Sequence, residues 1–179
     1  MMNVAYINVC TETEGPYKRL AIWFQGCNKR CKDCCNKELQ SLKVANLLTV
    51  DQILEIIKES KINNGIEGVT FLGGEPTIQN DLPELAIKIK ELDLGVILFT
   101  GYTMSQFSYE YLNCFDLIVD GEFDYSKLDL TRNMIGSKNQ NINLISNRYI
   151  NDLNWFYEER SNEIEINLND FLYMNGDVF

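Results

Sequence analysis

Residues 20–35, LAIWFQGCNKRCKDCC, join an apolar run to a dense group of cysteines. The apolar run at 20–24 predicts a buried β-strand, and Gly26 permits a tight turn into the cysteines. Four of the six cysteines fall within nine residues, which is not how the cysteines of an ordinary core are distributed. These four are Cys27, Cys31, Cys34 and Cys35. The stretch therefore predicts a strand that leads directly into a metal or redox centre.

Apolar strands and amphipathic helices alternate along the rest of the chain. Strands are expected at 4–9, 20–24, 69–72, 95–100, 117–119, 142–145 and 163–168. Helices are expected at 51–60, 82–92 and 105–113, with Thr49 or Asp51 capping the first and Asp81 the second. This alternation is typical of a parallel α/β sheet, open or barrel-like.

Glycine-rich and polar segments follow three of these strands. GGEPT follows the strand at 69–72, GYT follows the strand at 95–100, and DGEF follows the strand at 117–119. In parallel α/β folds the functional loops gather at the carboxyl ends of the strands. We therefore expect these segments to meet the cysteine loop at one edge of the sheet.

Length, composition and charge limit the class of protein. The 179 residues are 45% hydrophobic and 23% charged, which suits a single globular domain over 1–179 and excludes global disorder. The net charge of −10 argues against a nucleic-acid binder. No apolar stretch is long enough to cross a bilayer, and the amino terminus does not resemble a secretory signal. We expect a cytoplasmic protein without a membrane partner, in which structural disulfides are rare.

The chain contains no histidine, and this restricts its chemistry. Ser-His-Asp and Cys-His catalysis, histidine-ligated zinc or haem, and a histidine general base are all excluded. The spacing Cys27-x-x-x-Cys31-x-x-Cys34 leaves three alternatives. Zinc would need a fourth ligand, and a ferredoxin-type carrier a longer four-cysteine run. A 4Fe–4S cube held at three corners, with its fourth iron open to a substrate, is the interpretation we favour.

The cysteine loop resembles that of radical S-adenosylmethionine enzymes, and GGEP (73–76) resembles their glycine-rich loop. Alone, GGEP is typical of a turn; after such a cysteine loop it favours a ligand-binding loop. The resemblance implies a partial, open parallel βα barrel. It also implies two cofactors, a 4Fe–4S cluster and S-adenosylmethionine, and reductive cleavage of the latter to a 5′-deoxyadenosyl radical.

The segments GVTFLGGEPTIQ, LFTGYT, LIVDGEF and GSKNQNI resemble, in this order, the anaerobic ribonucleotide reductase activating proteins. The resemblance covers nearly the whole chain and includes a C-terminal hairpin within about 150–179. It implies that the protein generates a glycyl radical on a large partner, an anaerobic ribonucleotide reductase. Action on another peptide, protein or small molecule is the alternative, and a non-catalytic iron–sulfur or zinc module is a third hypothesis.

Site residues are carried over from this resemblance position by position. The cluster loop spans 26–36, and no catalytic residue is expected beyond the cluster and its cosubstrate. The resemblance implies that the ligands of the cluster are Cys27, Cys31 and Cys34. It implies that S-adenosylmethionine is bound by Gly73, Gly74, Glu75, Pro76, Thr100, Asp120, Gly136, Ser137, Asn139 and Gln140. For Asp120 a solvated turn acid is the alternative role, and for 137–140 an ordinary polar loop.

Two further features surround the cysteines. Asp33 stands where many members of the family have an aromatic residue, and Cys35 is an extra thiol, interpreted as a spare or a filler. Residues 1–46 carry seven Lys/Arg against four Asp/Glu, whereas residues 47–179 carry nine against twenty-two. This basic collar would attract an acidic electron donor, a flavodoxin or ferredoxin; its alternative role is to offset the charge of the cluster. The collar comprises Lys18, Arg19, Lys29, Arg30, Lys32 and Lys37.

Overall fold

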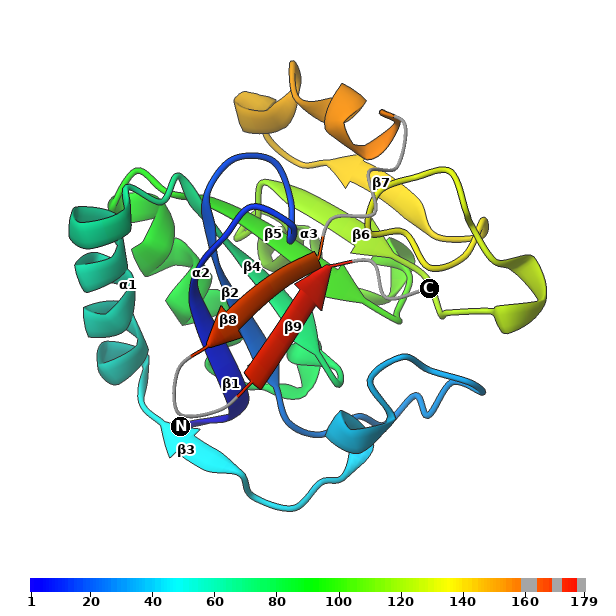
Figure 1. The fold of residues 1–179 in the computed structure, drawn as a ribbon, viewed down its shortest axis with the longest axis horizontal. Coiled ribbons are helices and arrows are strands. Elements are labelled where there is room, and N and C mark those ends of the chain that lie inside the picture. The colour runs from blue at the N-terminus through cyan, green and yellow to red at the C-terminus, as the bar shows by residue number, and fades with distance from the viewer. Residues whose placement is uncertain (159–163, 169–171, 177–179) are drawn as a thin grey trace.

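The computed structural model describes residues 1–158, 164–168 and 172–176. One sheet of seven strands has the order β3-β1-β2-β4-β5-β6-β7 (Figure 1). Its strands are β1 (Met2–Thr11), β2 (Arg19–Phe24), β3 (Asn46–Leu48), β4 (Gly68–Gly73), β5 (Gly95–Thr100), β6 (Leu117–Asp120) and β7 (Asn141–Leu144). The α-helices are α1 (Val50–Asn64), α2 (Leu82–Glu91) and α3 (Tyr109–Leu112). Short 3-10 helices lie at Lys37–Gln40, Pro76–Ile78, Met104–Gln106, Tyr125–Lys127, Asn147–Tyr149 and Leu153–Phe156.

The centre of the sheet is parallel. Strands β2, β4, β5 and β6 pair in parallel, whereas β1, β3 and β7 are antiparallel to their neighbours. The parallel strands are continuous apolar runs because they are covered on both faces, and all six residues of β2 are buried. The sheet ends at β3 and β7 and does not close. The expected open α/β architecture is confirmed.

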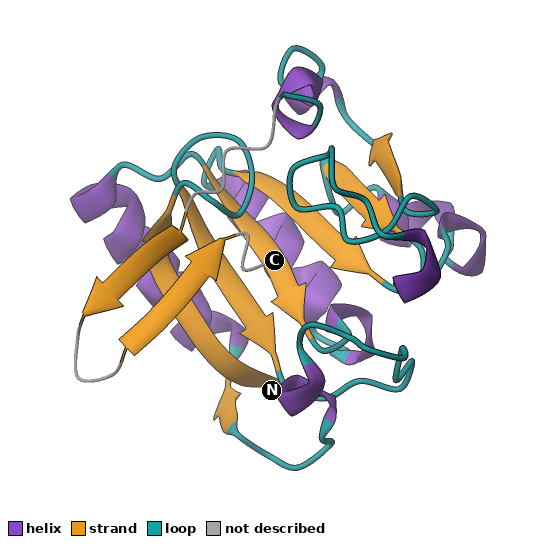
Figure 2. Ribbon diagram, turned by 45° about the vertical axis from the view of Figure 1, so that its right-hand side comes forward, coloured by secondary structure: helices purple, strands orange, loops and turns teal. Residues whose placement is uncertain are grey.

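Helices α1 and α2 cover one face of the sheet (Figure 2). Apolar side chains of α1 and α2, among them Ile53, Ile57 and Leu85, pack with Ile22 and Phe71 of the sheet in the largest core cluster. A smaller cluster lies on the other face, where Tyr6 stacks on Trp23 with ring centres 4.4 Å apart. The sheet is thus packed on both sides.

The expected helix caps have different outcomes. Thr49 caps α1, and its side chain and that of Gln52 form a reciprocal capping box. Asp81 precedes α2 but makes no side-chain cap, so that expectation is wrong. The Asp81 carboxylate instead pairs with the amino-terminal ammonium of Met1. The Asp81 carboxylate thus binds the ammonium of Met1 instead of the first N–H groups of α2.

Two elements extend the predicted set. β3 is a three-residue edge strand that the sequence pattern did not reveal. The strand expected at 163–168 is β8 (Ile164–Leu168), which pairs antiparallel with β9 (Leu172–Gly176). Two paired strands thus lie within the segment where the C-terminal hairpin is expected.

Arg19 is fully buried at the amino-terminal end of β2. Its guanidinium donates to Thr70 Oγ1 at 2.6 Å, to the Tyr149 hydroxyl at 2.8 Å and to the carbonyl of Val69 at 2.8 Å. Lys18 immediately precedes the same strand, whereas the cysteine loop follows its other end. The assignment of Lys18 and Arg19 to the basic collar is therefore wrong. They are near the cysteines in the sequence because β2 has only six residues, but they lie at the opposite end of this strand.

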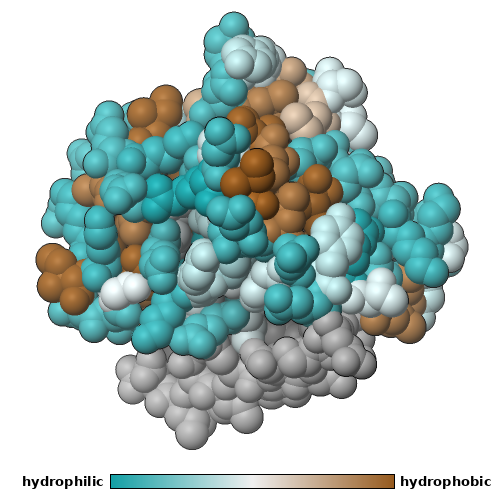
Figure 3. Space-filling model, turned by 90° about the horizontal axis from the view of Figure 1, so that it is seen from above, coloured by the Kyte–Doolittle hydropathy of each residue, from teal (hydrophilic) through white to brown (hydrophobic). Residues whose placement is uncertain are grey.

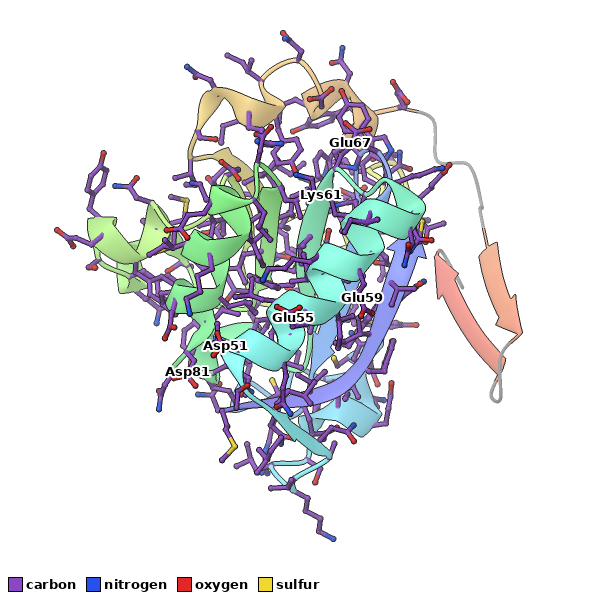
Figure 4. The ribbon with its side chains drawn as sticks, turned by 90° about the vertical axis from the view of Figure 1, so that its left-hand side faces the viewer. Asp51, Glu55, Glu59, Lys61, Glu67 and Asp81 are labelled. Carbon is purple, nitrogen blue, oxygen red and sulfur yellow. The ribbon has the colours of Figure 1, made fainter. Side chains whose placement is uncertain are left out.

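Acidic side chains gather on the helical side of the molecule. Asp51, Glu55 and Glu59 follow one another at four-residue spacing along α1 (Figure 4). Viewed from above, the molecule is mostly hydrophilic, with separated hydrophobic groups (Figure 3). Within residues 1–158, 164–168 and 172–176, no helix is long and apolar enough to cross a membrane.

Candidate metal and cosubstrate site

The predicted loops meet at the carboxyl edge of the parallel strands. The register pairs Phe24 of β2 with Gly73 of β4, and Thr100 of β5 with Asp120 of β6. The loops that follow these strands therefore leave the sheet side by side. This brings the cysteine, GGEP, GYT and DGEF segments to one edge, as expected.

Backbone hydrogen bonds fix the start of the cysteine loop. Gly26 donates to the carbonyl of Leu39 at 2.8 Å, and Cys27 donates to that of Gln40 at 3.3 Å. The carbonyl of Gly26 in turn accepts from the N–H of Glu75 at 2.8 Å. Gly26 has φ +102°, a conformation that glycine adopts without strain. The loop is thus attached both to the segment that follows it and to the GGEP loop.

The three predicted ligands lie on this loop with different exposure. Cys27 is buried, Cys31 and Cys34 are half-buried, and Cys35 is exposed. The backbone N–H of Lys29 points to the Cys27 sulfur at 3.4 Å. Such donors stabilise a thiolate, which is the form that binds iron.

The thiols differ in acidity. A hydrogen bond from the Cys35 thiol, opposed by burial, lowers the pKa of Cys34 to about 6. The same contact raises the pKa of Cys35 far above its usual range. Burial, with the nearby Glu122 carboxylate, raises the pKa of Cys31 to about 11. The contact between the two thiols thus favours the thiolate form of Cys34 and the protonated form of Cys35.

Three cysteine thiolates on one loop, in a chain without histidine, suit the irons of an iron–sulfur cluster. Among the described residues, no group of three or more Cys, Asp or Glu side chains is placed to hold one metal ion. A tetrahedral zinc site would draw its thiolates to within about 4 Å of one another. A cube contacts each thiolate through a different iron, so its ligands need not converge on one point.

Gly73 and Gly74 are required by close packing of backbone on backbone. A Cβ on Gly74 would lie 2.2 Å from the Gly26 carbonyl oxygen, and one on Gly73 would lie 2.4 Å from the Phe24 nitrogen. The side-chain amide of Asn36 donates to the Gly73 carbonyl at 3.3 Å. The glycines therefore seat the GGEP loop against the cysteine loop.

The Glu75 carboxylate is buried and accepts four hydrogen bonds. Oε1 accepts from Thr77 N at 3.1 Å, from Thr77 Oγ1 at 2.7 Å and from Thr100 Oγ1 at 2.8 Å. Oε2 accepts from the N–H of Gly101 at 2.8 Å. Pro76 is buried at the first position of the following 3-10 helix. The carboxylate joins the loop after β4 to the loop after β5.

Asp120 makes an equivalent junction one strand further on. Its Oδ2 accepts from the N–H of Met104 at 2.8 Å, and its Oδ1 accepts from the side chains of Asn141 and Asn143, each at 3.1 Å. Asp120 is buried, so the alternative of a solvated turn acid is wrong.

The loop at 136–140 closes on the loop after β6. Ser137 is fully buried, and its hydroxyl accepts from Asp124 N at 3.1 Å. The Gln140 amide donates to the Gly121 carbonyl at 3.2 Å, and that of Asn139 donates to the Glu122 carbonyl at 2.8 Å. These contacts bring the predicted adenosine-side residues to the same edge as Asp120.

A hollow of about 450 Å³ lies between this loop and the cysteine loop. Lys32 and Asp33 line it from the cysteine loop, residues 122–126 line it from the loop after β6, and Asn139 contributes from the third side. Asp33, at the position that is aromatic in many members of the family, thus lines this hollow.

Sequence reasoning missed Arg132. Its guanidinium pairs with Asp129 at 2.6 Å and donates to the carbonyls of Gln140 at 3.0 Å and Ser137 at 3.3 Å. These hydrogen bonds hold the 136–140 loop in place. No motif marks Arg132, because two of its partners are backbone carbonyls that are brought together only by the fold.

The chain is similar in sequence to known proteins. The family described as 4Fe–4S single cluster domain matches residues 13–143, and the chain belongs to this family. It is 26% identical over 147 residues to the anaerobic ribonucleoside-triphosphate reductase-activating protein of Enterobacteria phage T4, covering 79% of this chain and 93% of that protein. It is 29% identical over 141 residues to the protein of the same name from Pasteurella multocida, covering 70% and 87%. The resemblance to these activating proteins is therefore confirmed.

A solved structure also aligns with the chain. QueE from Escherichia coli covers 66% of this chain and 70% of its own, with 16% identity and a TM-score of 0.46.

Proposed function

We propose that the chain is a radical S-adenosylmethionine enzyme that activates an anaerobic ribonucleotide reductase in the cytoplasm. The observation that carries this proposal is the attachment of a three-cysteine loop to a glycine-rich loop, through the 2.8 Å bond from Glu75 N to the Gly26 carbonyl. Cys27, Cys31 and Cys34 would hold a cluster at three corners, and its fourth iron would be free to bind the cosubstrate. When bound, the cluster supplies the electron that cleaves S-adenosylmethionine to a 5′-deoxyadenosyl radical.

The chain's own residues bind and orient the cosubstrate in this proposal. The GGEP backbone lies against the cysteine loop and offers carbonyls to the methionine ammonium. Glu75 and Thr100 fix the path of that backbone by their mutual hydrogen bond. The hollow lined by Asn139 and Phe123 supports a site for the adenosine half, because it combines an aromatic ring with an amide.

An acidic electron donor, a flavodoxin or ferredoxin, remains part of the proposal. Arg30 and Lys32 are exposed on the cysteine loop. The rest of the collar is engaged: Lys29 pairs with Glu122 at 3.6 Å, and Lys37 with Asp33 at 3.3 Å. Arg30→Glu and Lys32→Glu should slow reduction by flavodoxin in a salt-dependent way and leave reduction by dithionite intact. Equal slowing with both reductants would contradict docking at this surface.

Two measurements test the activity. The protein is reconstituted anaerobically with iron and sulfide, reduced with dithionite and given S-adenosylmethionine, and 5′-deoxyadenosine is measured. If a preparation with an intact cluster forms no 5′-deoxyadenosine, the proposed enzymatic activity is refuted. Incubation with an anaerobic ribonucleotide reductase should then give a glycyl-type doublet in electron paramagnetic resonance. Formation of 5′-deoxyadenosine without this doublet would direct the proposal to another peptide or protein substrate.

A further inference from the structure

Tyr102, in the loop after β5, receives two contacts from the cysteine loop. The side-chain amide of Asn28 donates to its hydroxyl at 2.6 Å. The ammonium of Lys29 lies over its ring, 4.3 Å from the ring centre. Asn28 and Lys29 directly follow Cys27, so Tyr102 holds the part of the loop that leads to the next cysteine.

Lys29 links this contact to a cysteine sulfur. Its backbone N–H donates to Cys27 Sγ at 3.4 Å, while its ammonium also pairs with Glu122 at 3.6 Å. A Cβ on Gly101 would lie 3.3 Å from Lys29 Cγ, which is a tight contact. The glycine therefore lets the lysine side chain pack closely against the loop after β5. These side-chain contacts restrain Lys29 and thereby limit the movement of its N–H away from the sulfur.

Tyr102 is itself anchored to the core. Its N–H donates to Thr100 Oγ1 at 3.1 Å, and its carbonyl accepts from Gly121 N at 2.9 Å. Its ring meets Phe107 edge-on, with centres 5.9 Å apart. Phe107 stacks on Tyr111 at 4.9 Å, and Tyr111 packs on the fully buried Phe115 at 5.5 Å. A row of rings thus runs from the core to the cysteine loop.

We propose that Tyr102 is a positioning residue that acts through Lys29 to keep a hydrogen bond on Cys27 and thereby raises the reduction potential of the cluster. The inference rests on Cys27 as a cluster ligand in the proposed function and needs no assumption about the cosubstrate. Reduction adds negative charge to the cluster. A nearby ammonium and an N–H directed at a ligand sulfur therefore stabilise the reduced form.

The test uses the cluster-loaded protein, four single variants and the double variant Lys29→Met/Tyr102→Leu. Tyr102→Phe removes the hydroxyl, Lys29→Met removes the ammonium, and Tyr102→Leu removes both contacts. Tyr109→Leu is the control, because Tyr109 is a nearby tyrosine with 75% of its surface exposed. Hydrogen–deuterium exchange of the peptide containing residues 28–32 measures how firmly the loop is held, and a redox titration followed by electron paramagnetic resonance gives the midpoint potential.

We expect exchange in this peptide to accelerate about tenfold in Tyr102→Leu, because a cation–π contact and a hydrogen bond are both lost. Lys29→Met should give a smaller acceleration, and both variants should shift the midpoint potential to more negative values. If Tyr102 acts through Lys29, the effects of Tyr102→Leu and Lys29→Met on the potential will not add in the double variant. Tyr109→Leu should match the parent protein.

Unchanged loop exchange and potential in Lys29→Met and Tyr102→Phe would overturn the inference, even if Tyr102→Leu fails to fold. Additive shifts in the double variant would also overturn it, because they would show that Tyr102 does not act through Lys29. The formation of 5′-deoxyadenosine is measured separately. If the variants show the predicted shifts but the parent protein forms no 5′-deoxyadenosine, the proposed function is refuted and this inference is retained.

Discussion

The carboxylate of Glu75 accepts a hydrogen bond from the hydroxyl of Thr100 at 2.8 Å, and this bond joins the loops of two neighbouring parallel strands. Both residues are buried, and both belong to segments that the sequence marked as ligand-binding. The four hydrogen bonds to Glu75 come from within the protein. The residue therefore shapes the site from behind the surface that would meet a ligand.

Glu75→Gln should lower the free energy of unfolding by about 1–3 kcal/mol, because an amide presents an N–H₂ group to donors that need an acceptor. Urea denaturation of the metal-free protein measures this change. Glu59→Gln, an exposed acid on α1, is the matched control and should be neutral. A Glu75→Gln variant as stable as the control would show that the four bonds contribute little.

Gly74→Ala should separate the GGEP loop from the cysteine loop, because the added methyl group would lie 2.2 Å from the Gly26 carbonyl oxygen. We expect a loss of about 1–3 kcal/mol in unfolding free energy and a lower iron content after reconstitution. Gly65→Ala is the comparison: Gly65 also resists substitution, with φ +67°, but has open space around it. It should cost about 1 kcal/mol and leave the iron content unchanged.

Replacing single cysteines should separate the ligands from the spare thiol. Cys27→Ala, Cys31→Ala and Cys34→Ala should each lose the cluster, whereas Cys35→Ala should retain it. Iron analysis and the visible absorption of the thiolate–iron bands measure the outcome. Loss of the cluster in Cys35→Ala together with its retention in Cys34→Ala would exchange the roles of the two adjacent thiols.

Asp129 should make stability depend on acidic pH. Although burial opposes ionisation, hydrogen bonds from Thr131 and Arg132 hold the pKa of Asp129 well below its usual range. The stabilisation is therefore fully present above the usual carboxyl pKa of about 4 and is lost as the pH falls toward the folded-state value. Between about pH 4 and pH 2, Asp129→Asn should lose less stability than the parent protein in thermal unfolding. Equal losses would contradict this role.

Much of the fold could be predicted from the sequence because parallel strands leave continuous apolar runs. Such runs form β2, β4 and β5. A helix with a clear amphipathic pattern precedes each of the last two strands, α1 before β4 and α2 before β5. β3 could not be predicted, because an exposed three-residue edge strand depends on its pairing with Met2–Val4 rather than on its own side chains.

The position of the site could also be predicted, but the orientation of its side chains could not. Glu75 and Asp120 lie at the expected edge, yet their carboxylates bond to Thr100 and Met104. The sequence indicates which residues follow a strand. Which donor reaches a carboxylate first depends on the spacing between loops, which no single segment encodes. The same reason explains why Arg19 was placed among surface charges although the fold surrounds it with carbonyls and hydroxyls.

The bonds that attach the cysteine loop at Gly26 and Cys27 are formed entirely by main-chain atoms. The peptide groups that form these bonds belong to residues 26, 27, 39, 40 and 75, so the attachments do not depend on the side chains that lie between the cysteines. Main-chain atoms thus anchor the cysteine loop, whereas side-chain atoms adjust the redox properties of the site. A chimaeric protein with a foreign segment of identical cysteine spacing would keep its sulfurs at the sheet edge while taking on a different redox behaviour.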